Sequence, residues 1–141
     1  MERTLLIVKP DATERNLIGQ ILQRVELANF RIVEMRLVRL SPERARMFYS
    51  VHEGKPFLDG LVEFMSSGPA VAVVLEKENA ISDLRALVGT TDPAEAPCGT
   101  VRHDFGHDVR CNSVHASDAV KTAVTEIEFF FPGTQHESDS R

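Results

Sequence analysis

The chain has 141 residues, of which 43% are hydrophobic and 26% are charged, and its formal net charge is −5. These values are ordinary for one globular domain, so we interpret residues 1–141 as a single domain with a frayed tail over 134–141. The acidic balance argues against a nucleic-acid-binding protein, which usually presents a basic face. No apolar run approaches the roughly 20 residues of a membrane span. The apolar run near the N-terminus is too short for a signal-peptide core, so we expect a cytoplasmic protein.

The periodicity of apolar residues predicts an alternation of strands and helices. In chain order, strands are predicted over 4–9, 31–39 and 70–75, and helices over 17–26, 42–49, 58–65 and 79–88. The strand at 70–75 is an uninterrupted apolar run, which is typical of a central strand buried on both faces. The strand at 31–39 alternates in part, so Val33, Met35 and Leu37 are predicted to share one buried face.

Several element ends carry sequence signals. Pro10 ends the first strand because proline cannot donate to a sheet ladder. The polar residues 11–16 then predict a turn, with Asn16 as the N-cap of the following helix. Ser41 and Pro42 predict a helix start, as cap and first helical residue.

The segment 89–116 is polar, rich in Gly, Pro and Asp, and without periodicity. An irregular loop of this length tends to be functional. Ser117 and Asp118 predict the cap of a last helix, which runs to about Glu126, and 129–131 predicts a short strand or buried tail. Without the extra helices the order is βαββαβ. We therefore predict an α+β, ferredoxin-like fold with a four-stranded sheet, mixed or antiparallel, and helices on one face.

A metal site is the first chemical possibility to weigh. Four possible zinc ligands recur every four residues, namely His103, His107, Cys111 and His115. They would share a helical face, but Gly106 interrupts such a helix and residues 112–113 favour turns. We therefore predict no metal site. Cys98 and Cys111 form no CxxC pair and are expected to be thiols in a reducing cytosol.

Phosphate binding is the second possibility. Neither GxxxxGK[ST] nor GxGxxG occurs, so a phosphate site would have to use side chains. Lys9, Arg85 and Arg102 are candidates, although each taken alone could be a solvated surface charge. His115 is a candidate nucleophile because an unperturbed imidazole, with a pKa of about 6.5, is largely neutral near pH 7. Glu126 could accept from its other ring nitrogen and set the tautomer. On the bare sequence, His115 could also be a loop histidine without function.

Residues 112–118, Asn-Ser-Val-His-Ala-Ser-Asp, resemble the nucleoside diphosphate kinase signature N-x-x-H-G-S-D. Further stretches resemble that family in the same order, at 2–4 with 7–11, 55–57 with 61–69, 91–94 and 99–102. Five motifs in the right order are specific, and they cover nearly the whole chain. By this resemblance the chain is identified as a member of the family.

The resemblance implies a fold, a reaction and a site. The family has a ferredoxin-like α+β domain and transfers the terminal phosphate of a nucleoside triphosphate to a nucleoside diphosphate, by a ping-pong mechanism through a phosphohistidine. The implied catalytic residues are His115 as carrier, Glu126 as its partner, Ser117 hydrogen-bonded nearby and Tyr49 lining the site. The implied nucleotide-binding residues are Lys9, Arg85, Thr91 and Arg102 for the phosphates, Lys9 and Asn112 for the ribose, and Phe57 and Val109 for the base.

Partners and cofactors follow from the same resemblance. The partners are nucleoside di- and triphosphates. Mg²⁺ is expected to ride on the nucleotide phosphates rather than on protein ligands. Stacking on Phe57 predicts broad base tolerance, because every base has a π-face. A homo-oligomer built from dimers, either a tetramer or a hexamer, is expected.

Three positions depart from the family pattern. Ala116 replaces the usual Gly, which predicts a negative φ there and no loss of activity. Asp92 stands where Asn is common and is predicted to weaken nucleotide binding slightly. Residues 96–99 differ from the usual loop, which helps to build subunit contacts in the family. Two alternatives stay open: a non-catalytic ferredoxin-like nucleotide-binding or regulatory domain, since a fold alone does not give function, and a nucleic-acid-binding protein, which the net charge disfavours.

Overall fold

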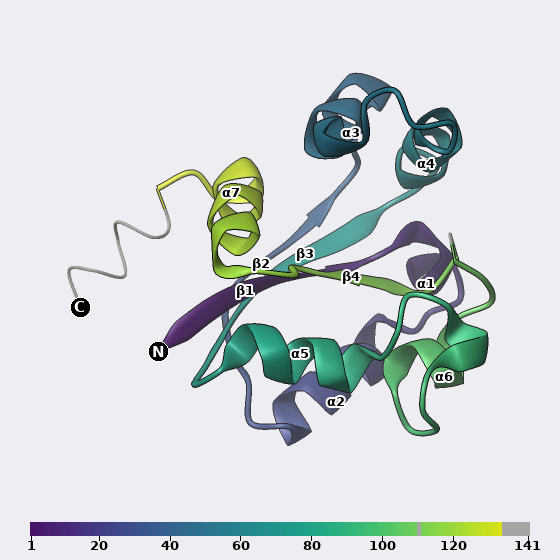
Figure 1. Cartoon of the computed structure of the whole chain (residues 1–141). Helices are drawn as coiled ribbons and strands as arrows, with labels where there is room; N and C mark the ends of the chain where they lie inside the picture. The colour runs from purple at the N-terminus through teal and green to yellow at the C-terminus, as the bar shows by residue number, and fades with distance from the viewer. Residues whose placement is uncertain (110, 134–141) are drawn as a thin grey trace.

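The computed structural model, which describes residues 1–109 and 111–133, has a sheet between two layers of helices (Figure 1). The strands are β1 (Glu2–Val8), β2 (Arg31–Val38), β3 (Ala70–Lys77) and β4 (Val114–Ala116). They lie in the order β2-β3-β1-β4, and all neighbours are antiparallel. The predicted four-stranded antiparallel, ferredoxin-like fold is confirmed. The tail predicted over 134–141 lies outside the described residues.

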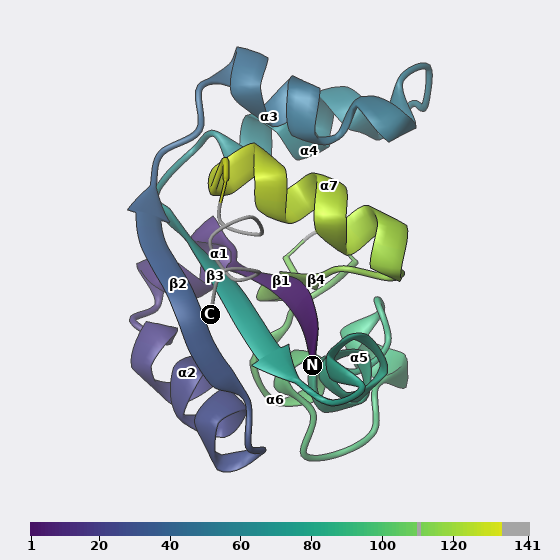
Figure 2. The ribbon, with the colours of Figure 1, turned by 90° about the vertical axis from the view of Figure 1, so that its left-hand side faces the viewer.

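Helices cover both faces of the sheet (Figures 1 and 2). One layer contains α2 (Ile18–Leu27), α5 (Ala80–Val88) and α6 (Val101–Phe105), and the other contains α3 (Pro42–Phe48), α4 (Leu58–Met65) and α7 (Val120–Phe130). The short helix α1 (Pro10–Glu14) follows β1, and two 3₁₀ turns lie at Ser50–His52 and Pro93–Glu95. The prediction that helices occupy one face is wrong. No helix of the described ranges has the length and apolar character to cross a membrane.

The reason for two helical layers is visible in the central strands. Along β1, Leu6 and Val8 belong to the core beneath α2 and α5, whereas Leu5 and Ile7 belong to the core beneath α3, α4 and α7. The strand β3 alternates in the same way, which confirms that it is buried on both faces. A sheet that is apolar on both faces must be covered on both.

The largest difference from the prediction lies near the C-terminus. The residues 129–131 form neither a strand nor a separate tail, because α7 continues through Phe130. Ala123, Ile127 and Phe130 are its buried positions, a spacing that places them on one helical face. The fourth strand is instead β4, within the segment 89–116. That segment is irregular over most of its length, but it also contains α6 and a 3₁₀ turn.

One predicted turn and two predicted helix caps are also wrong. Residues 11–16 are not a simple turn, because α1 occupies most of them. Asn16 adopts a left-handed φ of 60°, and Leu17 takes the N-cap position of α2. Ala119 precedes α7, which has no side-chain cap, so neither Ser117 nor Asp118 caps it. The cap at Ser41 is confirmed, since its hydroxyl accepts from the Arg44 amide.

The edge strand β2 contains a bulge that changes the predicted alternation of buried and exposed residues. The register shifts between Ile32 and Glu34, which inserts an extra residue and reverses the alternation. Val33 packs against the core beneath α3, α4 and α7, whereas Met35 and Leu37 pair with residues of β3 that face the other core. Met35 and Leu37 are 53% and 65% exposed. The predicted common buried face is therefore wrong.

Candidate active site

His115 lies in β4, which is held against β1 by an antiparallel pairing that places it opposite Ile7. Its Nε2 is 2.8 Å from Oε1 of Glu126 in α7. The hydroxyl of Ser117 donates to the same oxygen at 2.6 Å. An ionised carboxylate can only accept hydrogen bonds, so Nε2 carries the ring hydrogen and Nδ1 keeps its lone pair. Sheet, helix and hydroxyl together set both the position and the tautomer of the imidazole.

Aromatic rings pack beside this histidine. The Phe48 ring meets the His115 ring edge-on at 5.5 Å and also contacts Tyr49 and Phe130. Tyr49 is buried, and its hydroxyl has no hydrogen-bond partner among the described residues. Burial, and next the charge of Glu126, raise the pKa of Tyr49 above its usual value. The hydroxyl is therefore neutral.

Lys9 and Asn112 form a second buried group of the site. Nζ of Lys9 donates to Oδ1 of Asn112 at 2.8 Å. The Asn112 amide nitrogen donates to the backbone carbonyls of Thr91 and Val109 at 2.9 and 3.0 Å. Burial, followed by the nearby charge of Arg102, lowers the pKa of Lys9 to about 8. One amide thus ties the end of β1 to two parts of the segment 89–116.

Arg102 projects from α6 toward the same region. Its guanidinium donates to the carbonyls of Gly89 and Val114 at 2.8 and 3.0 Å, and these contacts do not neutralise its charge. Burial, and then the charge of Arg85, lower the pKa of Arg102 to about 10. Its Nε is buried without a hydrogen-bond partner among the described residues. Arg85 and Arg102 therefore form a pair of like charges, which favours the binding of an anion.

The turn after α5 depends on a glycine. Gly89 has a φ of 90°, and a Cβ at this position would lie 2.6 Å from the Thr100 hydroxyl. Only glycine accepts both this conformation and this close approach. Its carbonyl is thereby placed where it accepts from Arg102.

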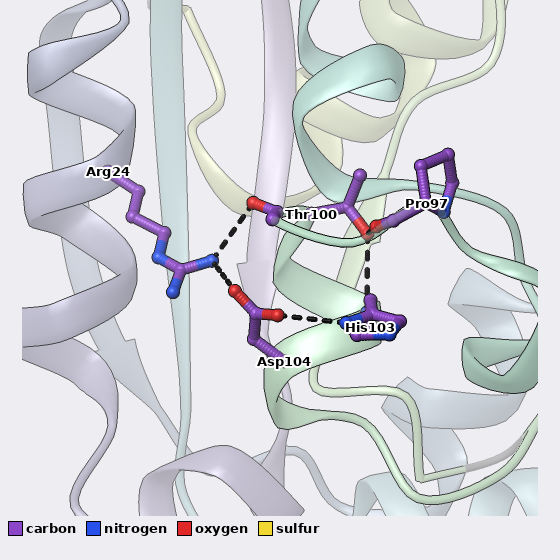
Figure 3. Close-up of polar contacts among 6 residues, drawn as sticks. Arg24, Pro97, Thr100, His103 and Asp104 are labelled. Atoms are coloured by element: carbon purple, nitrogen blue, oxygen red, sulfur yellow. Dashed lines mark hydrogen bonds and ion pairs between the residues drawn. The ribbon is translucent and has the colours of Figure 1, made fainter.

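A polar network anchors the stretch around α6 to α2 (Figure 3). Arg24 of α2 contacts the Asp104 carboxylate at 2.7 Å and the Gly99 carbonyl at 3.2 Å. The other oxygen of Asp104 lies 2.9 Å from Nδ1 of His103. Hydrogen bonds from His103 and Arg24 hold the pKa of Asp104 below its usual value. The guanidinium of Arg24 also lies over the Phe105 ring, 4.6 Å from its centre. The network thus fixes the chain at Gly99, before Arg102, and at Asp104, after it.

The three spaced histidines and Cys111 do not share a helix, because α6 ends at Phe105. His103 is paired with Asp104, and His115 with Glu126. Over residues 1–109 and 111–133, no three His, Cys, Asp or Glu side chains are grouped so as to hold a metal ion. No disulfide joins Cys98 to Cys111.

The residues assigned to the base are more exposed. Phe57 precedes α4 and is 45% exposed, and Val109 is 59% exposed. Phe57 meets the ring of His52 edge-on at 5.1 Å, and His52 stacks on Tyr49 at 6.3 Å. A row of rings therefore leads from the buried Tyr49 to Phe57. Val109 joins the rest of the site through its backbone carbonyl, which accepts from Asn112.

Comparison with known proteins identifies the family. A family model described as nucleoside diphosphate kinase matches residues 2–136. The chain belongs to the nucleoside diphosphate kinase family. It is 52% identical over 134 residues to a nucleoside diphosphate kinase of Acidiphilium cryptum, covering 95% of this chain and 96% of that protein. It is 53% identical over 131 residues to one of Halorhodospira halophila, covering 93% of each.

Solved structures of nucleoside diphosphate kinases agree with the fold. The Aquifex aeolicus protein superposes with a TM-score of 0.92 at 48% identity, covering 94% of this chain and 96% of that one. The Halobacterium salinarum protein, solved in complex with CDP, gives a TM-score of 0.90 at 42% identity, covering 93% and 88%. The family's reaction, transfer of the terminal phosphate from a nucleoside triphosphate to a nucleoside diphosphate, is thus the activity of this phosphotransferase.

The structure also bears on the departures from the family pattern. Ala116 lies in β4 and is not among the described residues with positive φ, so its predicted negative φ is confirmed. The carboxylate of Asp92 accepts from the Ala94 amide and caps the 3₁₀ turn. Sequence reasoning missed Asp11, Ser113 and Arg24, all of which support the site. Their partners are distant in sequence, so no local pattern signals them.

Proposed function

We propose that His115 is the phosphoryl carrier of this nucleoside diphosphate kinase. Nδ1 attacks the terminal phosphorus of a nucleoside triphosphate, a P–N bond forms, and the bond to the bridging oxygen breaks. The departing nucleoside diphosphate takes the electron pair of that bond. A second nucleoside diphosphate then attacks the phosphohistidine by the reverse steps, which gives ping-pong kinetics. The observation that supports this proposal is the contact of His115 Nε2 with Glu126, which leaves Nδ1 as the nucleophile.

Glu126 and Ser117 have positioning roles in this proposal. As Nδ1 gains phosphorus, the imidazole becomes more positive and its Nε2 hydrogen more acidic. The Glu126 carboxylate stabilises that change at a fixed distance, as the acid of a catalytic triad does. Ser117 donates to the same oxygen and limits the rotation of the carboxylate. The neutral Tyr49 hydroxyl lines the same space.

The cationic side chains bind the phosphates in this proposal. Phosphoryl transfer depends mainly on positioning and on positive charge at the equatorial oxygens. Lys9, Arg85 and Arg102 supply that charge, and guanidinium forks match the geometry of phosphate oxygens. Thr91 adds a hydroxyl, and Asn112 with Lys9 reaches the ribose.

The base is held by Phe57 on one face and by Val109 on the other. Both side chains are apolar and exposed, and neither distinguishes bases by hydrogen bonding. Broad base tolerance follows. The relative from Halobacterium salinarum was solved in complex with CDP, which supports nucleotide binding by this chain.

Mg²⁺ enters as part of the substrate, the magnesium complex of the nucleotide. The described residues offer no cluster of carboxylates that would hold the ion by itself, while the cations Lys9 and Arg102 suit its phosphate ligands. When bound, Mg²⁺ neutralises phosphate charge. The residues of this chain position the phosphates and the imidazole.

We also propose a domain organisation, a location and an assembly for the enzyme. Residues 1–141 act as one domain, the protein is cytoplasmic, and it forms a homo-oligomer, a tetramer or a hexamer built from dimers. Multi-angle light scattering distinguishes the two assemblies. A non-catalytic regulatory domain is disfavoured, because the family match and the intact His115–Glu126 pair both favour catalysis.

A labelling experiment tests the carrier role. The protein is incubated with Mg²⁺ and ATP labelled at the γ-phosphate, then chased with an unlabelled nucleoside diphosphate. We expect an acid-labile, alkali-stable label, mapped to His115, which the chase removes at the rate of turnover. Absence of label, or a label on another residue, contradicts the proposal.

A further inference from the structure

Asp11 is a buried acid that the mechanism above does not use. It lies in the first turn of α1, two residues after Lys9, and is almost fully buried. Its Oδ2 accepts from the Ser113 amide at 3.1 Å. Its Oδ1 is buried without a hydrogen-bond partner among the described residues. A buried charge is costly to maintain unless it is compensated, so its neighbours are informative.

The first neighbour is the turn that leads into β4. Ser113 is fully buried and has a φ of 77°, an unfavourable conformation for a residue with a Cβ. Its amide donates to Asp11, and its carbonyl accepts from the Lys9 amide at 2.9 Å. The residue before it is Asn112, and His115 is two residues after it. Asp11 thus holds the turn that positions the side chains of Asn112 and His115.

The second neighbour is Lys9, whose amide donates to the same Ser113 backbone that Asp11 holds. Burial and then the charge of Arg102 lower the pKa of the Lys9 ammonium, whereas Asp11 of α1, with Cys111 and Asp108 from the stretch before β4, raises it. The pKa that results, about 8, lies close to neutrality, so loss of one negative charge changes the protonated fraction of Lys9 directly. Asp11 is the carboxylate of this group that a backbone amide and a helix both hold in place.

We propose that Asp11 is a positioning residue for phosphoryl transfer, which keeps Lys9 charged and holds the Ser113 turn that presents Asn112 and His115. This inference rests on the proposed roles of Lys9 and His115. The Asp11 carboxylate then has two separable effects. Its charge keeps Lys9 protonated, an effect that depends on pH, and its hydrogen bond holds the Ser113 turn, an effect that does not.

Two substitutions separate the effects. In Asp11→Asn the amide oxygen still accepts from Ser113, but the negative charge is lost. In Asp11→Ala both the charge and the acceptor are lost. Asp83→Asn is the control for loss of a carboxylate charge, because Asp83 pairs with Lys77, which lies opposite Glu2 at the far end of β1 from Lys9. Each variant is compared with the wild type by circular dichroism.

The first readout is the pH profile of kcat/KM, which reports the pKa values of the free enzyme. The protonated Lys9 is the active form, so its contribution is present below a pH of about 8 and is lost above it. Above the pKa, lowering the pKa of Lys9 by one unit reduces the protonated fraction of Lys9 about tenfold. In Asp11→Asn the alkaline limb of the kcat/KM profile should therefore move to lower pH. Activity near pH 6 should change less than about twofold. Asp11→Ala should in addition lower kcat at every pH.

The second readout does not depend on activity. The protein is labelled with ¹⁵N-lysine, and the Lys9 signal, assigned by its absence in Lys9→Gln, is titrated by NMR. We expect a lower Lys9 pKa in Asp11→Asn and an unchanged one in Asp83→Asn. An unchanged Lys9 pKa in Asp11→Asn overturns the electrostatic half, whether or not the protein transfers phosphate. Failure of the proposed function would instead appear as absent labelling in the wild type.

A third variant tests the geometric half and guards against poor folding of Asp11→Ala. Ser113→Gly accepts positive φ without cost, so adding it to Asp11→Ala should restore kcat in part but leave the alkaline limb displaced. Equal kcat in Asp11→Ala and wild type at pH 6 would contradict a role for Asp11 in holding the turn.

Discussion

The two sides of the active site differ in how firmly they are built. Around His115, the imidazole is joined by hydrogen bonds to Glu126 and Ser117, and Lys9 is joined to Asn112; all of these side chains are buried or half-buried. Around the base, Phe57 and Val109 are exposed, and Phe57 is supported by a row of rings rather than by polar contacts. Phosphoryl transfer needs the nucleophile held within a fraction of an ångström, whereas a kinase that accepts many bases gains from a weakly specific surface.

This difference indicates which kinetic constant a substitution on each side should change. Changes on the His115 side should lower kcat, because they disturb an arrangement that matters in the transition state. Changes on the base side should raise KM and leave kcat nearly intact.

His115→Ala should abolish transfer, because it removes the proposed nucleophile. The side chain is partly exposed at the surface of the sheet, so the fold should survive. Coupled nucleotide assays measure the activity, and thermal unfolding checks the fold. A folded variant with turnover near that of the wild type would remove His115 from the mechanism.

Glu126→Gln should slow phosphorylation of His115 by about one to three powers of ten, as loss of a tautomer-fixing acceptor does. Glu128→Gln is the matched control on the same helix, because its side chain is exposed. Single-turnover quench-flow with labelled ATP measures the step. An unchanged rate would show that Ser117 and the sheet suffice to orient the imidazole.

Phe57→Ala should raise KM about three- to tenfold, since a base stacked on an aromatic ring gains about 1–3 kcal/mol when fully covered and Phe57 covers one face. The increase should be similar for adenine, guanine, cytosine and uracil nucleotides, and kcat should change little. Steady-state kinetics with the four diphosphates measure this. A loss confined to one base would reveal specific recognition on a side that we describe as tolerant.

Arg24→Ala should have the smallest effect, because Arg24 acts only through the network that anchors α6 (Figure 3). Loosening that anchor should raise KM by about two- to fivefold, in keeping with the small contribution of partly exposed ion pairs. Arg46→Ala is the control, since Arg46 pairs with Asp59 at the surface away from α6. Equal KM values in the two variants would mean that Arg102 holds its position without the network.

Much of the fold and site could be predicted from local patterns. The apolar run of β3 and the helix at 58–65 appear in the structure as predicted. Other features could not be predicted, because they depend on distant partners. The strand β4 has three residues and shows no periodicity, and only its pairing with β1 makes it a strand. The exposure of Met35 and Leu37 follows from a bulge that the alternation cannot reveal.

The sequence alone was enough to indicate the family and to name candidate site residues, because a motif such as residues 112–118 gives its side chains in order. How those side chains are held depends on the tertiary structure. Glu126 meets His115 because α7 packs across the sheet, and Asp11 meets Ser113 because β1 and β4 are neighbours. Hydrogen bonds act over about 3 Å, so residues separated by many positions can cooperate only after folding brings them together.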